Sequence, residues 1–229
     1  MNDYTLIVIS GTHRTGKTTL MEEFIKQNPE FQMLPFTVTN VWHEVFGNRP
    51  YTMDLPAADR VLFQYGLLNA WTLCVMDHVA QGGKWIIDRG PLDFASYMRL
   101  TLIDCMSHEV NLQAEHFVTN CIQATASLIS YEILVSPALH RINGEMVEDD
   151  ITKLTGKVGL MNQTVFHSIL RDVAQDTLRS SICSGYSVGQ LINLQELPSN
   201  ILDLQDRVNW LREVIDAKSK GKARLQPTG

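Results

Sequence analysis

Leu6-Ile-Val-Ile-Ser-Gly11-Thr-His-Arg-Thr-Gly16-Lys17-Thr18-Thr19 is the stretch that decides the fold of this chain. An apolar, β-branched run ends in the pattern Gly-x-x-x-x-Gly-Lys-Thr, and apolar residues at helical spacing follow it. This is the order of strand, phosphate-binding loop and helix that a P-loop requires. The stretch therefore predicts an α/β domain that binds a polyphosphate.

Each residue type in this loop suits that chemistry. Gly11 and Gly16 allow the backbone to approach a polyphosphate and to adopt positive φ. The loop amides and the N-terminus of the next helix direct donors at the anion. Lys17 is placed to reach the β- and γ-phosphates, and the Thr18 hydroxyl to ligate Mg²⁺. The predicted ATP site consists of Gly11, Thr12, His13, Arg14, Thr15, Gly16, Lys17, Thr18 and Thr19.

The composition is that of an ordinary globular protein. Of the 229 residues, 45% are hydrophobic and 19% are charged, which suits one large α/β domain with a buried core. The formal net charge of −6 argues against general nucleic-acid binding, which requires a basic face. Four scattered cysteines are typical of reduced thiols, and no apolar stretch approaches the ~20 residues of a membrane span. We therefore expect a cytoplasmic protein that binds neither nucleic acid nor a membrane.

Strand and helix patterns alternate along the chain. Strands are expected at 4–10, 31–38, 84–88, 131–135 and 187–194, and helices at 16–27, 57–81, 91–102, 109–128, 160–179 and 201–217. Residues 39–46 are expected to carry the second strand toward the ligand side. This alternation predicts a three-layer α/β sandwich, a five-stranded parallel sheet with helices on both faces and ligands at the carboxyl ends of the strands.

The sequence also predicts the structural roles of three segments. The helix at 57–81 is apolar around most of its circumference, so it lies either in the core or at a homodimer contact, and periodicity does not separate the two. The polar, acidic segment 136–158 is long for a compact domain and is expected to be a lid-like loop of a domain spanning 1–217. The basic tail 218–229 is expected to be disordered.

The expected strand at 84–88 supplies the acidic residue that a P-loop needs for Mg²⁺. Trp85-Ile-Ile-Asp88 places a carboxylate at the end of an apolar strand, and Arg89 follows it. An arginine at this place has a planar fork of donors that holds phosphoryl oxygens in pairs. We therefore expect Thr18 and Asp88 to ligate Mg²⁺ and Arg89 to lie beside the phosphates.

The stretch Asp88-Arg89-Gly-Pro-Leu-Asp93-Phe-Ala-Ser-Tyr97 resembles the Asp-Arg motif of the P-loop nucleoside and nucleotide kinases. It is similar to the motif in thymidylate kinases and deoxynucleoside kinases, and most similar to that of ribosylnicotinamide kinases. Arg60-Val-Leu-Phe-Gln64 resembles the preceding helix, where these kinases contact the acceptor, and the segment from Leu197-Pro198 to Asp206-Arg207-Val208 resembles their last strand-to-helix passage. The resemblance implies an acceptor site that includes Arg60, Gln64, Arg89 and Asp93.

Arg14 adds a finer resemblance. One class of thymidylate kinases has an arginine at this loop position, where it contacts the γ-phosphate, and has a lid poor in basic residues. The segment 136–158 is likewise acidic, so Arg14 is either the cation that this segment lacks or an exposed surface residue. The chain departs from that class at His13, where those enzymes have an acid that binds the acceptor sugar.

These residues predict an ATP-dependent phosphotransferase that uses Mg²⁺ and acts on a small nucleoside or nucleotide. The expected catalytic residues are Lys17, Arg14, Asp88 and Arg89. A monophosphate acceptor is favoured because the chain offers two phosphate-binding arginines. A nucleoside, such as a deoxynucleoside or nicotinamide riboside, is the alternative, and it needs Asp88 or Asp93 as a base. A regulatory P-loop ATPase or nucleotide switch is an alternative of another class.

Overall fold

The computed structural model describes residues 3–12, 15–50, 55–103, 108–136, 141–142, 145–146, 160–183 and 193–223. The strands are β1 (Tyr4–Gly11), β2 (Phe31–Met33), β3 (Gly83–Asp88), β4 (Tyr131–Val135), β5 (Arg141–Ile142), β6 (Glu145–Met146) and β7 (Asn193–Leu197). The helices are α1 (Lys17–Gln27), α2 (Val38–Phe46), α3 (Ala57–Val79), α4 (Pro91–Ile103), α5 (His108–Leu128), α7 (Leu160–Cys183) and α8 (Leu204–Ala223).

Five strands form one sheet in the order β2-β3-β1-β4-β7, and each neighbouring pair is parallel. The predicted five-stranded parallel sheet is therefore confirmed. In the register, Ile9 of β1 lies opposite Asp88 of β3, and Gly11 lies opposite Val135 of β4. The carboxyl ends of the three central strands thus meet at one edge of the sheet, where parallel α/β folds place their ligands.

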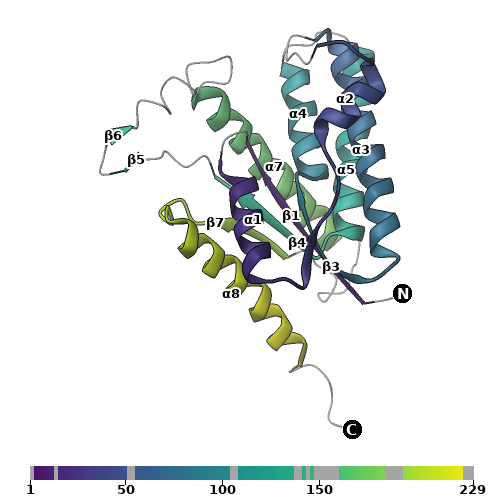
Figure 1. The fold of residues 1–229 in the computed structure, drawn as a ribbon. Coiled ribbons are helices and arrows are strands. Elements are labelled where there is room, and N and C mark those ends of the chain that lie inside the picture. Colours follow the sequence, from purple (N-terminus) through teal and green to yellow (C-terminus); the bar gives the residue numbers. More distant parts are fainter. Residues whose placement is uncertain are drawn as a thin grey trace.

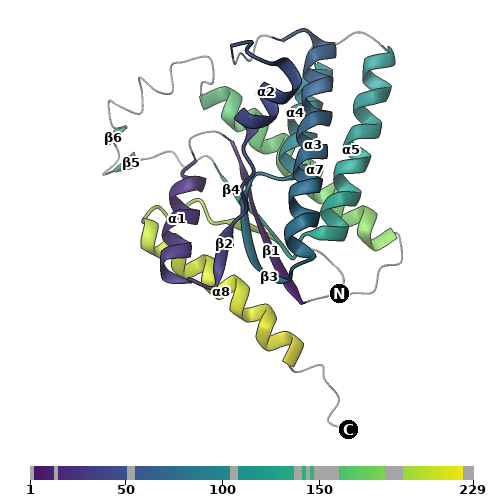
Figure 2. The same cartoon turned by 45° about the vertical axis from the view of Figure 1, so that its right-hand side comes forward.

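Helices cover both faces of this sheet. Figures 1 and 2 show α1 and α8 on one face and α3, α4, α5 and α7 on the other. The side chains of β1 alternate between two buried clusters, because successive residues of a strand point to opposite faces. Leu6 and Val8 pack with α3, α4 and α5, whereas Ile7 and Ile9 pack with α1 and α8. The predicted three-layer sandwich is confirmed.

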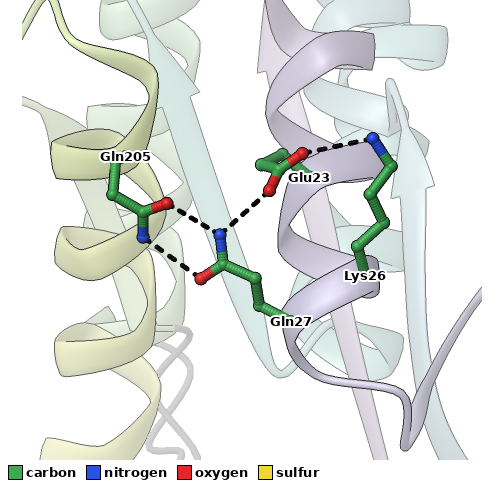
Figure 3. Close-up of polar contacts among 4 residues, drawn as sticks. All are labelled: Glu23, Lys26, Gln27 and Gln205. Carbon is green, nitrogen blue, oxygen red and sulfur yellow. Dashed lines mark hydrogen bonds and ion pairs between the residues drawn. The ribbon is translucent and has the colours of Figure 1, made fainter.

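A polar network joins α1 to α8, the two helices on one face of the sheet (Figure 3). The side-chain amides of Gln27 and Gln205 donate to each other's oxygens, at 2.8 and 3.1 Å. Glu23 accepts from Gln27 and from Lys26. The Arg212 guanidinium also donates to Gln27, at 3.0 Å. This network fixes the position of α8 against the helix that begins at the P-loop.

The second strand is shorter than expected, and the residues after it form a helix. We expected a strand at 31–38 that continues through 39–46, but β2 ends at Met33 and α2 covers Val38–Phe46. Pro35 lacks the backbone N–H that a strand would need at that place. Thr37 then caps α2, its side chain accepting the N–H of Asn40 at 3.3 Å, so local capping outweighed the β-branched composition.

The strand and the helix near the end of the chain have different bounds from the expected ones. The last strand lies at Asn193–Leu197 instead of 187–194, and residues 184–192 are outside the described residues. Asp203 accepts the N–H groups of Gln205 and Asp206, at 2.8 and 3.1 Å, so α8 begins at 204 instead of 201. This helix continues to Ala223, six residues past its predicted end at 217; residues 224–229 of the predicted disordered tail lie outside the described residues.

The expected lid-like loop and the expected homodimer contact stay predictions. Of the lid-like segment 136–158, the structure describes only residue 136 and the antiparallel pair β5–β6. Along α3, Val61, Leu67 and Trp71 are buried, whereas Leu62, Leu73 and Met76 are exposed. The helix therefore has one face in the core, and the homodimer contact remains an expectation. Within the described ranges, none of the helices has the length and apolar character needed to cross a membrane.

Candidate phosphate-binding site

The P-loop connects β1 to α1 at the carboxyl edge of the sheet. Gly16 adopts φ 79°, in the left-handed region, and is the N-cap of α1. Its carbonyl oxygen accepts the first helical N–H, from Leu20, at 2.9 Å. The Thr15 hydroxyl donates to the Thr12 carbonyl at 3.1 Å, and Thr19 is exposed. His13 and Arg14 lie outside the described residues, so their predicted contacts with ATP stay predictions.

Gly11 is needed at this position because the backbone of β4 comes very close. It has φ 150°, and a Cβ added to it would lie 2.5 Å from the carbonyl oxygen of Val135. The first P-loop glycine therefore allows the close packing of β1 and β4, and the ligand access predicted from the sequence is a separate expectation.

Gly11→Ala is expected to lower the free energy of unfolding by about 2–4 kcal/mol, because neither backbone can move without breaking the β1–β4 pairing. Gly47→Ala is the matched control. Gly47 also has a positive φ, 62°, but nothing lies within 4 Å of its added Cβ. That control is expected to cost only about 1 kcal/mol, the conformational part. Thermal unfolding of the two variants measures the difference, and equal losses would contradict the close-approach argument.

Lys17 is folded onto the P-loop. Only 5% of its surface is exposed, and its Nζ donates to the carbonyl oxygens of Gly11 at 2.9 Å and Thr12 at 2.6 Å. Burial lowers the pKa of Lys17 to about 8; the charge of Arg89 also lowers it, while Asp88 and Asp93 oppose the shift. The loop therefore holds a desolvated cation at the place where the sequence predicted one.

Thr18 and Asp88 meet across the β1–β3 pair. The Thr18 hydroxyl donates to Oδ2 of Asp88 at 3.1 Å, and the other oxygen, Oδ1, is buried without a hydrogen-bond partner among the described residues. A hydroxyl beside a carboxylate with an unused oxygen is an oxygen donor set of the kind that Mg²⁺ takes, the remaining positions being filled by water and phosphate. The two residues therefore fit the predicted metal.

Arg89 follows Asp88 in a strained backbone conformation. Its φ is 73°, and among the described residues it is the only non-glycine with positive φ. Its carbonyl accepts from Trp71 Nε1 at 3.2 Å, and its guanidinium donates to the Tyr97 hydroxyl at 3.4 Å. Strain at one residue that neighbouring groups hold in place is typical of functional sites. Burial lowers the pKa of Arg89, but Tyr97, Asp93 and Asp88 raise it by more, so the side chain is a permanent cation.

Asp93 lies buried beneath the P-loop and the turn that follows β3. Its side chain is fully buried, with Oδ1 accepting the Gly11 N–H at 3.0 Å and Oδ2 the Gly90 N–H at 3.2 Å. Its expected contact with the acceptor stays a prediction. The geometry favours Asp88 over Asp93 as a base, because Asp88 keeps an unused oxygen beside Thr18.

The two predicted acceptor residues of α3 lie on the helix face that contains Trp71. Gln64 precedes Trp71 by two turns and is 8% exposed, and Arg60 is one turn further. Trp71 contacts the Arg89 carbonyl at the end of β3. Gln64 is seven residues before Trp71, so it lies about 10 Å from Trp71 along the axis of α3. Its Oε1 is buried and has no hydrogen-bond partner in the part of the chain that the structure describes. Buried amide oxygens normally have partners, so a ligand donor is the expected complement.

Sequence reasoning assigned no role to Arg207, which contacts the P-loop from α8. Its Nη1 donates to the Thr15 carbonyl at 3.3 Å and its Nε to the Ile201 carbonyl at 2.9 Å. The one sequence feature that pointed to Arg207 was the resemblance of Asp206-Arg207-Val208 to a strand-to-helix passage. That resemblance did not indicate which group the guanidinium contacts.

Sequence reasoning also missed a polar cluster at the ends of β4 and β7. The Ser136 hydroxyl donates to Glu196 at 2.9 Å, and Nε2 of His167 lies 3.0 Å from the same oxygen. Arg171 Nε is 3.2 Å from the other carboxylate oxygen. Since Nε2 of His167 faces both Ser136 and Glu196, the cluster lacks the relay geometry of a Ser-His-acid triad.

Comparison with known proteins agrees with this geometry. The sequence profile of a family described as "AAA domain" matches residues 6–123, just over half of the chain and the part that carries the P-loop and the Asp-Arg pair. No curated protein matches the sequence.

Three solved structures show the same fold. The deoxyadenosine kinase of M. mycoides, solved with the products dCMP and dCDP, has a TM-score of 0.55 and 12% identity over 93% of this chain and 100% of its own. A thymidylate kinase from Candida albicans has a TM-score of 0.53 and 16% identity, covering 95% of this chain and 93% of its own. The NadR protein in complex with NR has a TM-score of 0.57 and 15% identity, and this chain spans 50% of its length.

The profile match covers both specific motifs, and the fold likeness extends over nearly the whole chain. This chain therefore belongs to the AAA domain family, and its fold is that of the P-loop nucleotide kinases.

Proposed function

We propose that this chain transfers the γ-phosphoryl group of ATP to a nucleoside monophosphate. The observation that carries the proposal is the 3.1 Å contact between Thr18 Oγ1 and Asp88 Oδ2. It joins the start of α1 to the end of β3, so that one edge of the sheet combines a P-loop lysine, an oxygen pair suited to Mg²⁺ and a buried arginine. Phosphoryl transfer depends on positioning and on charge stabilisation, and these are the groups it requires.

Some of these residues act on the phosphate donor, ATP, and others act on the phosphate acceptor. Lys17 exchanges its two carbonyl partners for the β- and γ-phosphates, where its charge stabilises the transferring group. Thr18 and Asp88 would hold Mg²⁺, which would act there as a Lewis acid and stabilise the charge of the phosphates. Arg89, fixed by Trp71 and Tyr97, clamps the acceptor phosphate. Arg14 remains in this proposal as a second cation at the γ-phosphate.

A nucleoside acceptor is the second candidate, and one observation favours it. A nucleoside hydroxyl needs a base to accept its proton, and Oδ1 of Asp88 is a buried carboxylate oxygen without a partner among the described residues. A monophosphate acceptor needs no such base. With either acceptor, the unused amide oxygen of Gln64 is a partner for a donor on the base, and Arg60 lies one turn beyond it.

The decisive experiment measures ADP formed from ATP and Mg²⁺ alone, then with common nucleoside monophosphates, nucleosides and nicotinamide riboside. ADP formation that depends on a monophosphate is the expected result, and dependence on a nucleoside would select the second candidate. Hydrolysis that no acceptor changes would overturn both and favour a regulatory ATPase. Asp88→Asn is expected to abolish the acceptor-dependent turnover, whereas Asp77→Asn, at an exposed position of α3, is expected to leave it unchanged.

A further inference from the structure

Two carboxyl groups are fully buried behind the P-loop, and the proposed function leaves one of them without a role. Glu132 is on β4 and Asp93 on α4, and neither has any exposed surface. The hydroxyl of Ser10, the residue before the first P-loop glycine, is hydrogen-bonded to Oε1 of Glu132, and its interaction with Asp93 favours the ionised form of that carboxyl and so lowers the pKa of Asp93. The other oxygen of Glu132, Oε2, has no hydrogen-bond partner within the described residues.

Asp93 connects this cluster to the backbone of the P-loop. Its two oxygens accept the amides of Gly11 and Gly90, at 3.0 and 3.2 Å. Gly11 begins the loop, and its carbonyl oxygen accepts from Lys17. A displacement of the Asp93 carboxylate would therefore change the position of the first loop glycine and of the carbonyl that Lys17 contacts.

Counting protons limits the charge states that the cluster can adopt. The Ser10 hydroxyl has one proton and interacts with two carboxyl groups: it is hydrogen-bonded to Glu132, and it favours the ionised form of Asp93. If both carboxyls were ionised, Ser10 could donate to only one, and its oxygen would face the lone pairs of the other. One additional proton removes this conflict: a protonated Glu132 donates to Ser10 Oγ, and Ser10 donates to ionised Asp93. Oε2 of Glu132 is then a neutral carbonyl oxygen, which costs far less to leave unpaired than a buried charge.

We propose that Glu132 is a positioning residue that stays protonated at neutral pH and, through Ser10, holds Asp93 and the Gly11 amide in the phosphate-binding conformation. The proton on Glu132 follows from the buried cluster alone. The consequence for nucleotide binding rests on the proposed function.

The surrounding charges place the proton on Glu132 and not on Asp93. Burial raises the pKa of Glu132 well above its usual value, and the nearby charge of Asp93 raises it as well, with only the Ser10 hydrogen bond opposing. Burial also raises the pKa of Asp93, but Arg89, Lys17, Ser10 and the Gly11 amide all favour its ionised form. The cations of the site therefore lie on the Asp93 side of the pair.

The protonation state can be measured without any assay of activity. In protein labelled with ¹³C at glutamate Cδ, the resonance absent from Glu132→Gln identifies Glu132. We expect its chemical shift to be that of a protonated carboxyl at pH 7 and to stay so from pH 5 to pH 8. The shift of an ionised carboxylate at pH 7 would overturn the proposal.

Thermal stability gives an independent readout. Because folded Glu132 keeps a proton that the unfolded chain releases above about pH 4.3, wild-type stability decreases as pH rises from there toward the folded pKa. Glu132→Gln removes this dependence, since the amide donates to Ser10 without titrating. Its Tm relative to wild type is expected to increase by about 4 °C per pH unit over this range. A Tm difference that stays constant or decreases would contradict the proposal.

The effect on the P-loop is tested by ATP binding in calorimetry. Glu132→Gln is expected to keep the wild-type Kd, whereas Ser10→Ala and Glu132→Leu, which break the chain of hydrogen bonds, are expected to raise it about tenfold. Wild-type Kd in a folded Ser10→Ala protein would overturn the positioning role. If wild-type protein binds no ATP, the proposed function fails, while the NMR and melting results still decide the proton.

Discussion

Lys17→Ala is expected to lower kcat for phosphoryl transfer by about 10³-fold while the protein stays folded. Lys17 supplies a buried charge at the phosphate loop, and no other described residue of α1 offers a cation at that place, since Lys26 is exposed at the far end of the helix. Lys26→Ala is therefore the matched control and is expected to keep wild-type activity. Unchanged turnover in folded Lys17→Ala protein would remove the kinase assignment.

The same substitution has an expected effect on stability, with a defined pH dependence. Burial lowers the pKa of Lys17 to about 8, below its unfolded value of about 10.4, so the charged form costs the ligand-free fold on the order of 3 kcal/mol. This cost is fully present below pH 8 and disappears as the pH rises toward about 10.4. The two hydrogen bonds to Gly11 and Thr12 partly offset it. Differential scanning calorimetry should show the Tm of Lys17→Ala, relative to wild type, decreasing between pH 8 and pH 10.

Arg89→Gly and Arg89→Ala are both expected to lower kcat by about 10³-fold, because both lose the guanidinium that holds the acceptor phosphate and balances its charge during transfer. Steady-state kinetics with the identified acceptor measures this loss. Arg89→Lys keeps the charge but not the planar fork, so its activity is expected to fall between those of wild type and the other two variants. A folded Arg89→Gly protein with wild-type kcat would show that the guanidinium is only a structural cation.

The two small variants of Arg89 separate chemistry from backbone strain. Both lose the guanidinium, but glycine adopts φ 73° without the cost of about 1 kcal/mol that alanine incurs. Arg89→Gly is therefore expected to melt about 3 °C above Arg89→Ala. Equal melting temperatures would mean that the conformation at residue 89 stores no strain.

Much of the fold could be predicted from residues close together in the sequence. The Gly-x-x-x-x-Gly-Lys-Thr pattern and the acid at the end of β3 each depend on a few neighbouring positions, and the parallel sheet brings Thr18 to Asp88 as expected. The errors occurred where local propensity competes with context. Residues 38–46 are rich in Val, Thr and aromatic residues, yet the Thr37 cap and the burial of Trp42 produce a helix.

The buried polar contacts behind the site could not be predicted, for a physical reason. Ser10 and Glu132 are 122 residues apart, and Thr15 and Arg207 are 192 apart. Nothing in either local sequence specifies the partner, since a serine in a strand and a glutamate in another both look like ordinary surface-facing positions. Asp93 similarly accepts from the Gly11 amide, 82 residues away, and its local sequence does not specify that partner.

The contact between Arg207 and Thr15 has a consequence for how the protein matures during synthesis. The phosphate loop is made within the first twenty residues, but the guanidinium that holds its Thr15 carbonyl is translated almost two hundred residues later. A ribosome-bound nascent chain that lacks α8 would therefore present the whole nucleotide-binding motif without the support of its last helix. The Thr15 carbonyl would gain its contact with Arg207 only after that helix leaves the exit tunnel and docks.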